Sequence, residues 1–139
     1  MPLRVAWDAG VSAPAAHPVE KNQYDELVVP TEWRETIADI VSAFTKGNYS
    51  LDGIDAARLG SHLTADDIRW NIEQYGDVLI DLPAEAWDTS VYLWMGEHWD
   101  VLVDLFVLGE EGRSDLVLFV RVFEGVKSYS YVVYSVHVP

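Results

Sequence analysis

The ionisable side chains best placed for chemistry lie in one short stretch of the sequence. Glu97, His98, Asp100 and Asp104 follow one another closely in a segment with strand-like alternation. Because neighbouring strand residues point to opposite sides, His98 and Asp100 can converge, whereas Glu97 and His98 cannot. Carboxylates beside aromatic rings can act as general acid or base when their pKa values are shifted. An ordinary polar strand face has the same spacing, and we favour a structural or binding role.

The sequence carries no motif for metal, phosphate or covalent chemistry. It has no cysteine, and His17, His62 and His137 do not have the spacing of a zinc motif. There is no G-x-S-x-G elbow, and residues 109–112 carry acids where a phosphate loop needs amides and a lysine. We therefore predict no catalytic residue, no metal site and no cofactor, and we classify the chain as a non-enzyme.

The net charge of −14 over 139 residues is the strongest global property. Such a field repels nucleic acid and anionic membrane surfaces. No Lys or Arg occurs from Trp70 to Gly112, a segment that contains Glu73, Asp77, Asp81, Glu85, Asp88, Glu97, Asp100, Asp104, Glu110 and Glu111. A cationic partner would offset the self-repulsion of this segment. The alternative explanation is that negative charge keeps a protein soluble.

Three sequence features favour a cytoplasmic protein. The N-terminal residues lack the apolar core of a signal peptide. No apolar run approaches the roughly 20 residues of a membrane span. The absence of cysteine suits a reducing compartment.

Two helices are predicted in the first half of the chain. The first is capped at Thr31 and ends before Gly47, and its apolar stripe has helical spacing: Trp33, Ile37, Ile40, Val41 and Phe44. The second is capped at Thr64 and ends at Gly76. Repeated prolines in residues 1–30 predict an extended arm with a short strand at 26–29. The connector at 48–63 is expected to contain at most a helical turn, near 55–59.

After Gly76 the period of the apolar residues changes from about 3.6 to 2, which indicates strands. The predicted strands are 77–82, 88–95, 99–108, 115–124 and 129–138, and short glycine-containing turns join the later ones. The fold class is therefore α+β, with two helices packed on one face of a four- to five-stranded antiparallel meander. Residues 31–139 form a single domain, preceded by the arm.

Residue parity divides the predicted sheet into two faces. One face is almost purely aliphatic and includes Val91, Leu93 and Met95 of the 88–95 strand and Tyr134 among the valines of the last. The opposite face, the aromatic–carboxylate face, contains Asp88, Tyr92, Trp94, Asp100, Asp104, Phe106, Phe119, Arg121, Phe123, Tyr129, Tyr131 and His137. Tyr, Trp and Arg are typical of interface hot spots. Alternatively, the arm or a curved sheet buries these rings as a second core, with Arg121 paired to Asp100 or Asp104 across strands.

Two stretches of the sequence resemble a family of small uncharacterised bacterial domains. They are Thr89–Leu105 and Glu111–Leu118, and the similarity extends from Val29 to Pro139. That family has no assigned activity, so the resemblance implies no catalytic residues. In size and acidity the chain is also similar to immunity proteins of contact-dependent growth inhibition and other polymorphic toxin systems. Acidic immunity proteins typically mask basic nuclease toxins, so this second resemblance implies a cationic toxin domain as the partner.

We therefore expect an immunity-type protein that binds and neutralises a cationic toxin domain and binds neither nucleic acid nor membranes. The residues expected at the interface are Asp88, Trp94, Glu97, Asp100, Asp104, Arg121 and Tyr131. One alternative is a small-molecule-binding or enzymatic α+β domain with a pocket on the aromatic–carboxylate face. Another is a homodimer that packs two such faces together.

Overall fold

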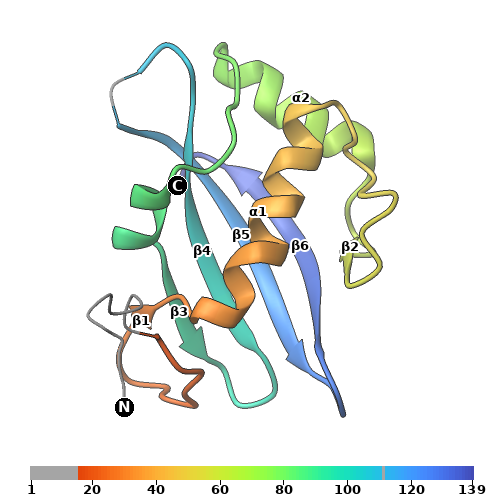
Figure 1. Ribbon diagram of the computed structural model, residues 1–139. Helices are drawn as coiled ribbons and strands as arrows, with labels where there is room; N and C mark the ends of the chain where they lie inside the picture. Colours follow the sequence, from red (N-terminus) through yellow and green to blue (C-terminus); the bar gives the residue numbers. More distant parts are fainter. Residues whose placement is uncertain (1–15, 111) are drawn as a thin grey trace, which may run out of the picture.

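A computed structural model describes residues 16–110 and 112–139 and shows two α-helices with a six-stranded sheet (Figure 1). The helices are α1 (Thr31–Thr45) and α2 (Ala65–Tyr75), with a short 3-10 helix, η1 (Ala84–Asp88). The strands are β1 (Leu27–Val28), β2 (Ala57–Leu59), β3 (Val91–Trp94), β4 (Trp99–Phe106), β5 (Arg113–Glu124) and β6 (Tyr129–His137). Neither α-helix has the length and apolar composition needed to cross a membrane.

The sheet has the order β1-β3-β4-β5-β6-β2. Strands β3 to β6 form the predicted antiparallel meander, and β1 pairs with β3 inside the predicted strand 26–29. The helical turn expected near 55–59 is wrong, because β2 pairs in parallel with the edge of β6 and satisfies its backbone groups. The predicted strand 77–82 is reduced to a single bridge between Leu79 and Val107. The sheet is therefore mixed, with a short strand at each edge.

The two α-helices have different N-terminal caps. At α2 the Thr64 side chain accepts from the Asp67 backbone and the Asp67 carboxylate accepts from the Thr64 backbone, a capping box. At α1 the prediction is wrong by one residue, because Pro30 occupies the cap position and Thr31 is the first helical residue. The Thr31 hydroxyl instead accepts a hydrogen bond from the His17 backbone at 2.9 Å. Thr31 thus holds the arm against the start of α1.

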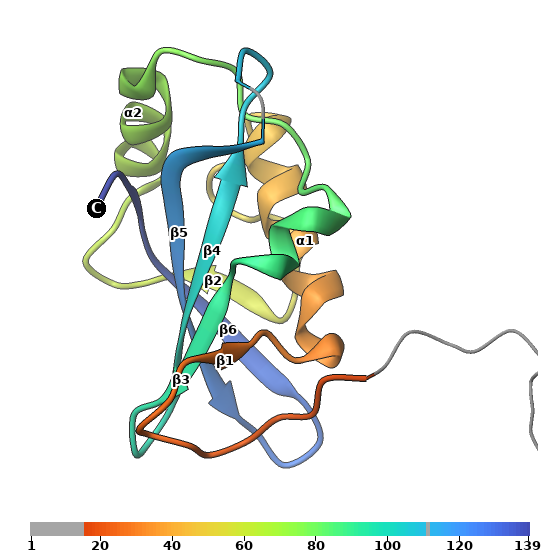
Figure 2. The same ribbon diagram turned by 90° about the vertical axis from the view of Figure 1, so that its left-hand side faces the viewer.

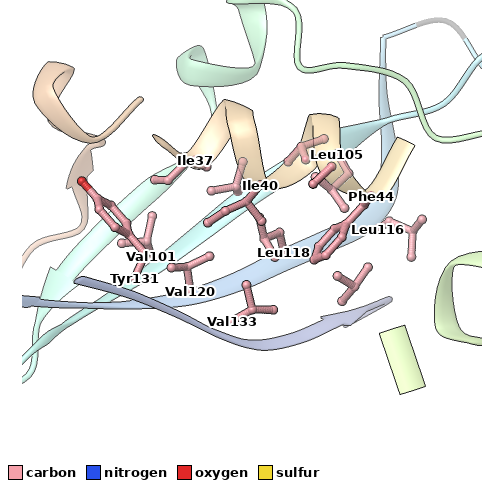
Figure 3. Packing of buried hydrophobic residues seen from close by; sticks show 14 of the residues in the cluster. Ile37, Ile40, Phe44, Val101, Leu105, Leu116, Leu118, Val120, Tyr131 and Val133 are labelled. Atoms are coloured by element: carbon pink, nitrogen blue, oxygen red, sulfur yellow. The ribbon is translucent and has the colours of Figure 1, made fainter. Parts of the chain in front are cut away.

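The main core lies between α1 and one face of the sheet. We call this the helix-covered face; its central residues are Tyr92, Trp99, Val101, Val103, Leu118, Val120, Val122, Tyr131 and Val133. Figure 3 shows Ile37, Ile40 and Phe44 of α1 directed into these strand residues. The predicted stripe of α1 is therefore confirmed as its buried side.

The second helix has a different place from the one expected. It contacts β6, and Ile68 and Ile72 join the same buried cluster. In Figure 2, however, α1 lies on one side of the strands and α2 on the other, across the upper end of β5. The expectation that both helices cover one face is thus met by α1, while α2 closes an end of the sheet.

Residues 16–26 run along the sheet beside β3 and the β3–β4 turn, and we call them the strap (Figure 2). The Glu20 backbone donates to the Tyr92 hydroxyl at 2.8 Å, and that hydroxyl donates to the Pro18 carbonyl at 3.2 Å. The Trp99 indole donates to the Glu20 carbonyl at 3.0 Å. The described part of the predicted arm is therefore extended and packed on the domain, while residues 1–15 lie outside the described residues.

Candidate functional site

The sheet face opposite α1 is covered by no helix along most of β3 and β4 among the described residues (Figure 2). We call it the open face; its residues are Val28, Val91, Leu93, Asp100, Leu102, Asp104, Val117, Phe119, Arg121, Tyr134, Ser135 and His137. Leu102 is 38% exposed and the adjoining Met95 is 49% exposed. A sheet face of this kind exposes apolar side chains that a partner can cover.

A hollow of about 310 Å³ lies on the open face. Its lining is mainly apolar and consists of Glu26, Val91, Tyr92, Leu93, Met95, Asp100, Leu102 and Phe119. A larger hollow of about 450 Å³ lies between α1 and residues 48–56, but polar groups make up most of its lining. Binding sites are usually apolar with a few fixed polar groups, so the smaller hollow is the better candidate.

Strand register explains why β3 contributes aliphatic side chains to this hollow. Leu93 lies opposite Asp100, and Val91 lies opposite Leu102, which in turn faces Phe119. Directly opposed residues in an antiparallel pair share a face, so Val91 and Leu93 lie on the side of Asp100. The predicted division of β3 is therefore wrong: its aliphatic residues are on the open face and its aromatic residues are on the helix-covered face.

Asp100 and Arg121 form the charged centre of the open face. The Arg121 Nε donates to Asp100 Oδ1 at 3.1 Å, which confirms Asp100 as the predicted cross-strand partner. The Arg121 guanidinium also lies 4.2 Å from the centre of the Tyr134 ring, a cation–π contact. These contacts fix Arg121 and leave the centre of the face close to neutral.

His98 converges on the same carboxylate, as its spacing from Asp100 predicts. Its Nε2 lies 3.2 Å from Asp100 Oδ1, although the geometry is not that of a hydrogen bond. The ring packs on Phe123 with 5.3 Å between ring centres, and Nε2 is shielded from solvent. The imidazole therefore lies against Asp100 at the turn between β3 and β4 and is held there by its contact with Phe123.

Asp104 occupies the other end of the open face and is also compensated within the chain. Its carboxylate accepts from the Thr89 hydroxyl and from Arg113 Nη1, the latter at 3.3 Å. Its backbone N–H donates to the buried Ser90 hydroxyl at 3.0 Å. Asp104 thus ties η1, β3 and β5 together.

Two of the predicted interface residues lie on the wrong side of the sheet. Tyr131 is 4% exposed and belongs to the helix-covered face, because the register of β5 and β6 shifts after Phe119. Phe119 pairs with Ser135, but the next residue pairs with Val133, so Tyr134 is an extra residue in β6. The bulge places Tyr131 under α1 and brings Tyr134 to the open face. Burial raises the pKa of Tyr131 to about 12, with an opposing hydrogen bond from Thr36.

Trp94 is the second such residue. It pairs with Trp99 across β3 and β4, and their ring centres are 4.7 Å apart. The Lys21 ammonium of the strap lies 5.1 Å from the centre of the Trp94 ring and pairs with Glu124 at 3.0 Å. The strap therefore covers Trp94, Tyr92 and Trp99, but these rings pack in or against the main core and do not form the second core that the alternative expected on the aromatic–carboxylate face.

Asp88 and Glu97 are exposed, as an interface role requires. Asp88 ends η1, and Glu97 lies in the turn that follows Met95. Neither is joined by an ion pair to a described residue, and the same is true of Glu26 at the hollow. Of the predicted set, Asp100, Asp104 and Arg121 share the open face. Glu97 lies in the turn beside it, whereas Asp88 ends η1, which lies on the α1 side of the strands in Figure 2.

Sorting the strand residues into alternating sets assigned Val91, Leu93 and Tyr134 to the wrong face; all three lie on the open face. No signal in the sequence marks the bulge at Tyr134, since neither Gly nor Pro is present there. The short turn between β3 and β4 is a signal for β3, because a hairpin across it pairs Leu93 with Asp100 and so puts both on one face. Within the described residues, no three His, Asp or Glu side chains are grouped so as to hold a metal ion.

The comparisons with other proteins give one family. No curated protein and no solved structure matches the chain. The matching family is described as a domain of unknown function (DUF7668), and the match begins within α1 and continues through β6. Since residues 41–139 match, most of the chain is covered, and the protein belongs to this family.

Proposed function

We propose that the protein is a non-enzymatic, immunity-type binding protein that neutralises a cationic protein domain of toxin type. The open face would be its interface. The observation that carries the proposal is an uncovered sheet face with a mainly apolar hollow beside exposed carboxylates, on a chain of net charge −14. Such an arrangement suits a partner that combines apolar anchors with basic residues.

The geometry changes which carboxylates would attract that partner. Asp100 and Asp104 are held by Arg121 and Arg113, so their role would be to fix the shape of the face. Glu26, Asp88 and Glu97 are exposed, pair with no cation in the described part of the chain, and would supply the attracting charge. Exposed charges of this kind mainly raise the rate of association and its specificity.

The test is co-expression with the product of the gene immediately upstream. We expect that product to arrest growth alone, growth to be restored by this protein, and a purified complex to form at low and moderate salt. The triple variant Glu26→Lys, Asp88→Lys, Glu97→Lys should weaken the complex at least tenfold. A matched variant with Glu35→Lys, Asp66→Lys and Glu73→Lys, at exposed sites on α1 and α2, controls for net charge. A harmless upstream product, or no complex at either salt concentration, would rule the proposal out.

One observation favours a second candidate, the binding of a small apolar molecule. The hollow of about 310 Å³ is at the lower end of the roughly 300–1,000 Å³ typical of ligand pockets. The discriminating measurement is thermal unfolding of the protein with a library of small apolar carboxylic acids and amines. A dose-dependent rise in melting temperature that is lost in Leu102→Lys would support this candidate over the protein partner.

A further inference from the structure

We propose that the hollow is the socket for one large apolar side chain of a cationic protein segment, whose neighbouring Lys or Arg residues meet Glu26 and Glu97. This inference rests on the proposed function, because it names the feature by which the partner would be recognised. The occupant is a segment with an aromatic or long aliphatic residue flanked by basic residues.

The size and lining of the hollow suit a single side chain. Its volume of about 310 Å³ far exceeds the roughly 30 Å³ that one water occupies. Its apolar lining is Val91, Leu93, Met95, Leu102 and Phe119. Such a surface offers water few hydrogen-bond partners, so an apolar group that displaces the water gains affinity. Met95 is unbranched and half exposed, and can adjust to the shape of the entering group.

The hollow is already formed without a partner. Its floor is the paired region of β3, β4 and β5, where Leu102 faces Phe119. The strap bounds it at Glu26, and the Trp94 backbone donates to the Asn22 carbonyl at 3.3 Å, which ties the strap to β3. A site with its walls in place needs little ordering when it binds, and this preserves affinity.

Charge around the hollow selects the kind of segment. The nearest described cations are already engaged, Arg121 with Asp100 and Lys21 with Glu124 and Trp94. Glu26 lines the hollow, and Glu97 follows Met95 in the adjoining turn. An acidic segment, or a second copy of this chain with its net charge of −14, would bring carboxylates together there. A basic segment removes that repulsion.

The direct test uses synthetic peptides as probes of the full chain. The probe is acetyl-Lys-Lys-Trp-Lys-Lys-amide, compared with the same peptide carrying Ala in place of Trp and with acetyl-Glu-Glu-Trp-Glu-Glu-amide. Binding is followed by NMR of labelled methyl groups at low salt. We expect the Lys–Trp peptide to shift the methyl signals of Leu93, Met95 and Leu102, the Ala peptide to bind at least tenfold more weakly, and the Glu peptide to give no shifts.

A pair of matched variants separates the socket from general acidity. Leu102→Lys places a cation in the hollow, and Leu108→Lys makes the same change of charge at a 72% exposed site beyond the end of β4. Leu102→Lys should reduce the affinity for the Lys–Trp peptide at least tenfold, whereas Leu108→Lys changes it less than threefold. Urea unfolding midpoints serve as the check that both variants remain folded.

Four outcomes would overturn the inference. They are equal binding of the Trp and Ala peptides, equal losses of affinity in the two variants, NMR shifts confined to the hollow beside residues 48–56, and a dimer in sedimentation that Leu102→Lys dissociates.

The upstream gene product then separates the two proposals. If Leu102→Lys still restores growth, the socket is wrong and the proposed function stands. If that product is harmless but the peptides bind as expected, the socket stands and the toxin partner is wrong.

Discussion

The two faces of the sheet are built from the same strands, but one is covered within the chain and the other is largely open. On the helix-covered face, α1 and the strap enclose Trp99, Tyr92 and Tyr131, and their rings are almost completely buried. On the open face, aliphatic residues and the rings of Phe119 and Tyr134 surround Asp100 and Arg121, and Leu102 is 38% exposed. Large rings gain most from full burial, and both tryptophans of β3 and β4 lie on the face that has a second layer. The open face keeps partly exposed apolar groups and internally paired charges, which a partner can cover.

Truncation of one leucine on each face should show the largest difference. Leu118→Ala removes a fully buried side chain and is expected to lower the free energy of unfolding by about 2–5 kcal/mol. Leu102→Ala is expected to cost less than about 1 kcal/mol, because the side chain is partly in solvent. Urea unfolding of both variants measures the difference. Similar losses would show that the open face is part of the core and is not free for binding.

The covered face should also make the protein sensitive to alkali. Burial raises the pKa of Tyr131 from 10.0 to about 12, so its contribution to stability is fully present below pH 10 and is lost as the pH rises towards 12. Burial also raises the pKa of Tyr92 and Tyr129. Tyr131→Phe should therefore lose less stability than the wild type between pH 10 and 12.

The measurement for Tyr131 is the urea midpoint at several pH values from 8 to 12. Tyr24→Phe, at a ring that is 85% exposed, controls for the removal of a hydroxyl. Parallel pH profiles for Tyr131→Phe and the wild type would show that the Tyr131 hydroxyl does not distinguish the folded from the unfolded chain.

The smallest difference is expected between the coupling free energies of two charge pairs, one on the open face and one at the strap. A double-mutant cycle of Asp100→Ala and Arg121→Ala is expected to give a coupling of about 0.2–1 kcal/mol, since both side chains are largely shielded from solvent. Lys21 and Glu124 are each 52% exposed, and their coupling should be close to zero. Urea unfolding of each cycle supplies the values. A larger coupling for Lys21–Glu124 would make the strap, and not the open face, the better-fixed charged site.

The sequence by itself determined the two α-helices and the antiparallel meander of this protein. Helical spacing identified the buried side of α1, Thr64 and Gly76 marked the ends of α2, and the change to period 2 located the meander. These signals are local, because they depend on the dihedral preferences and spacing of nearby residues. The sequence also narrowed the cross-strand partner of Arg121 to Asp100 or Asp104, and the register of β4 and β5 selects Asp100.

Only the tertiary structure decided which face each side chain occupies. Parity gives two sets of residues per strand, but the register with the neighbouring strand decides which set faces α1. The pairing of Leu93 with Asp100 reversed β3, and the single extra residue Tyr134 reversed the first half of β6. Those two facts placed Tyr92, Trp94 and Tyr131 on the side of α1 and the strap, and Tyr134 on the open face. They left on the open face the apolar hollow that now carries the functional proposal.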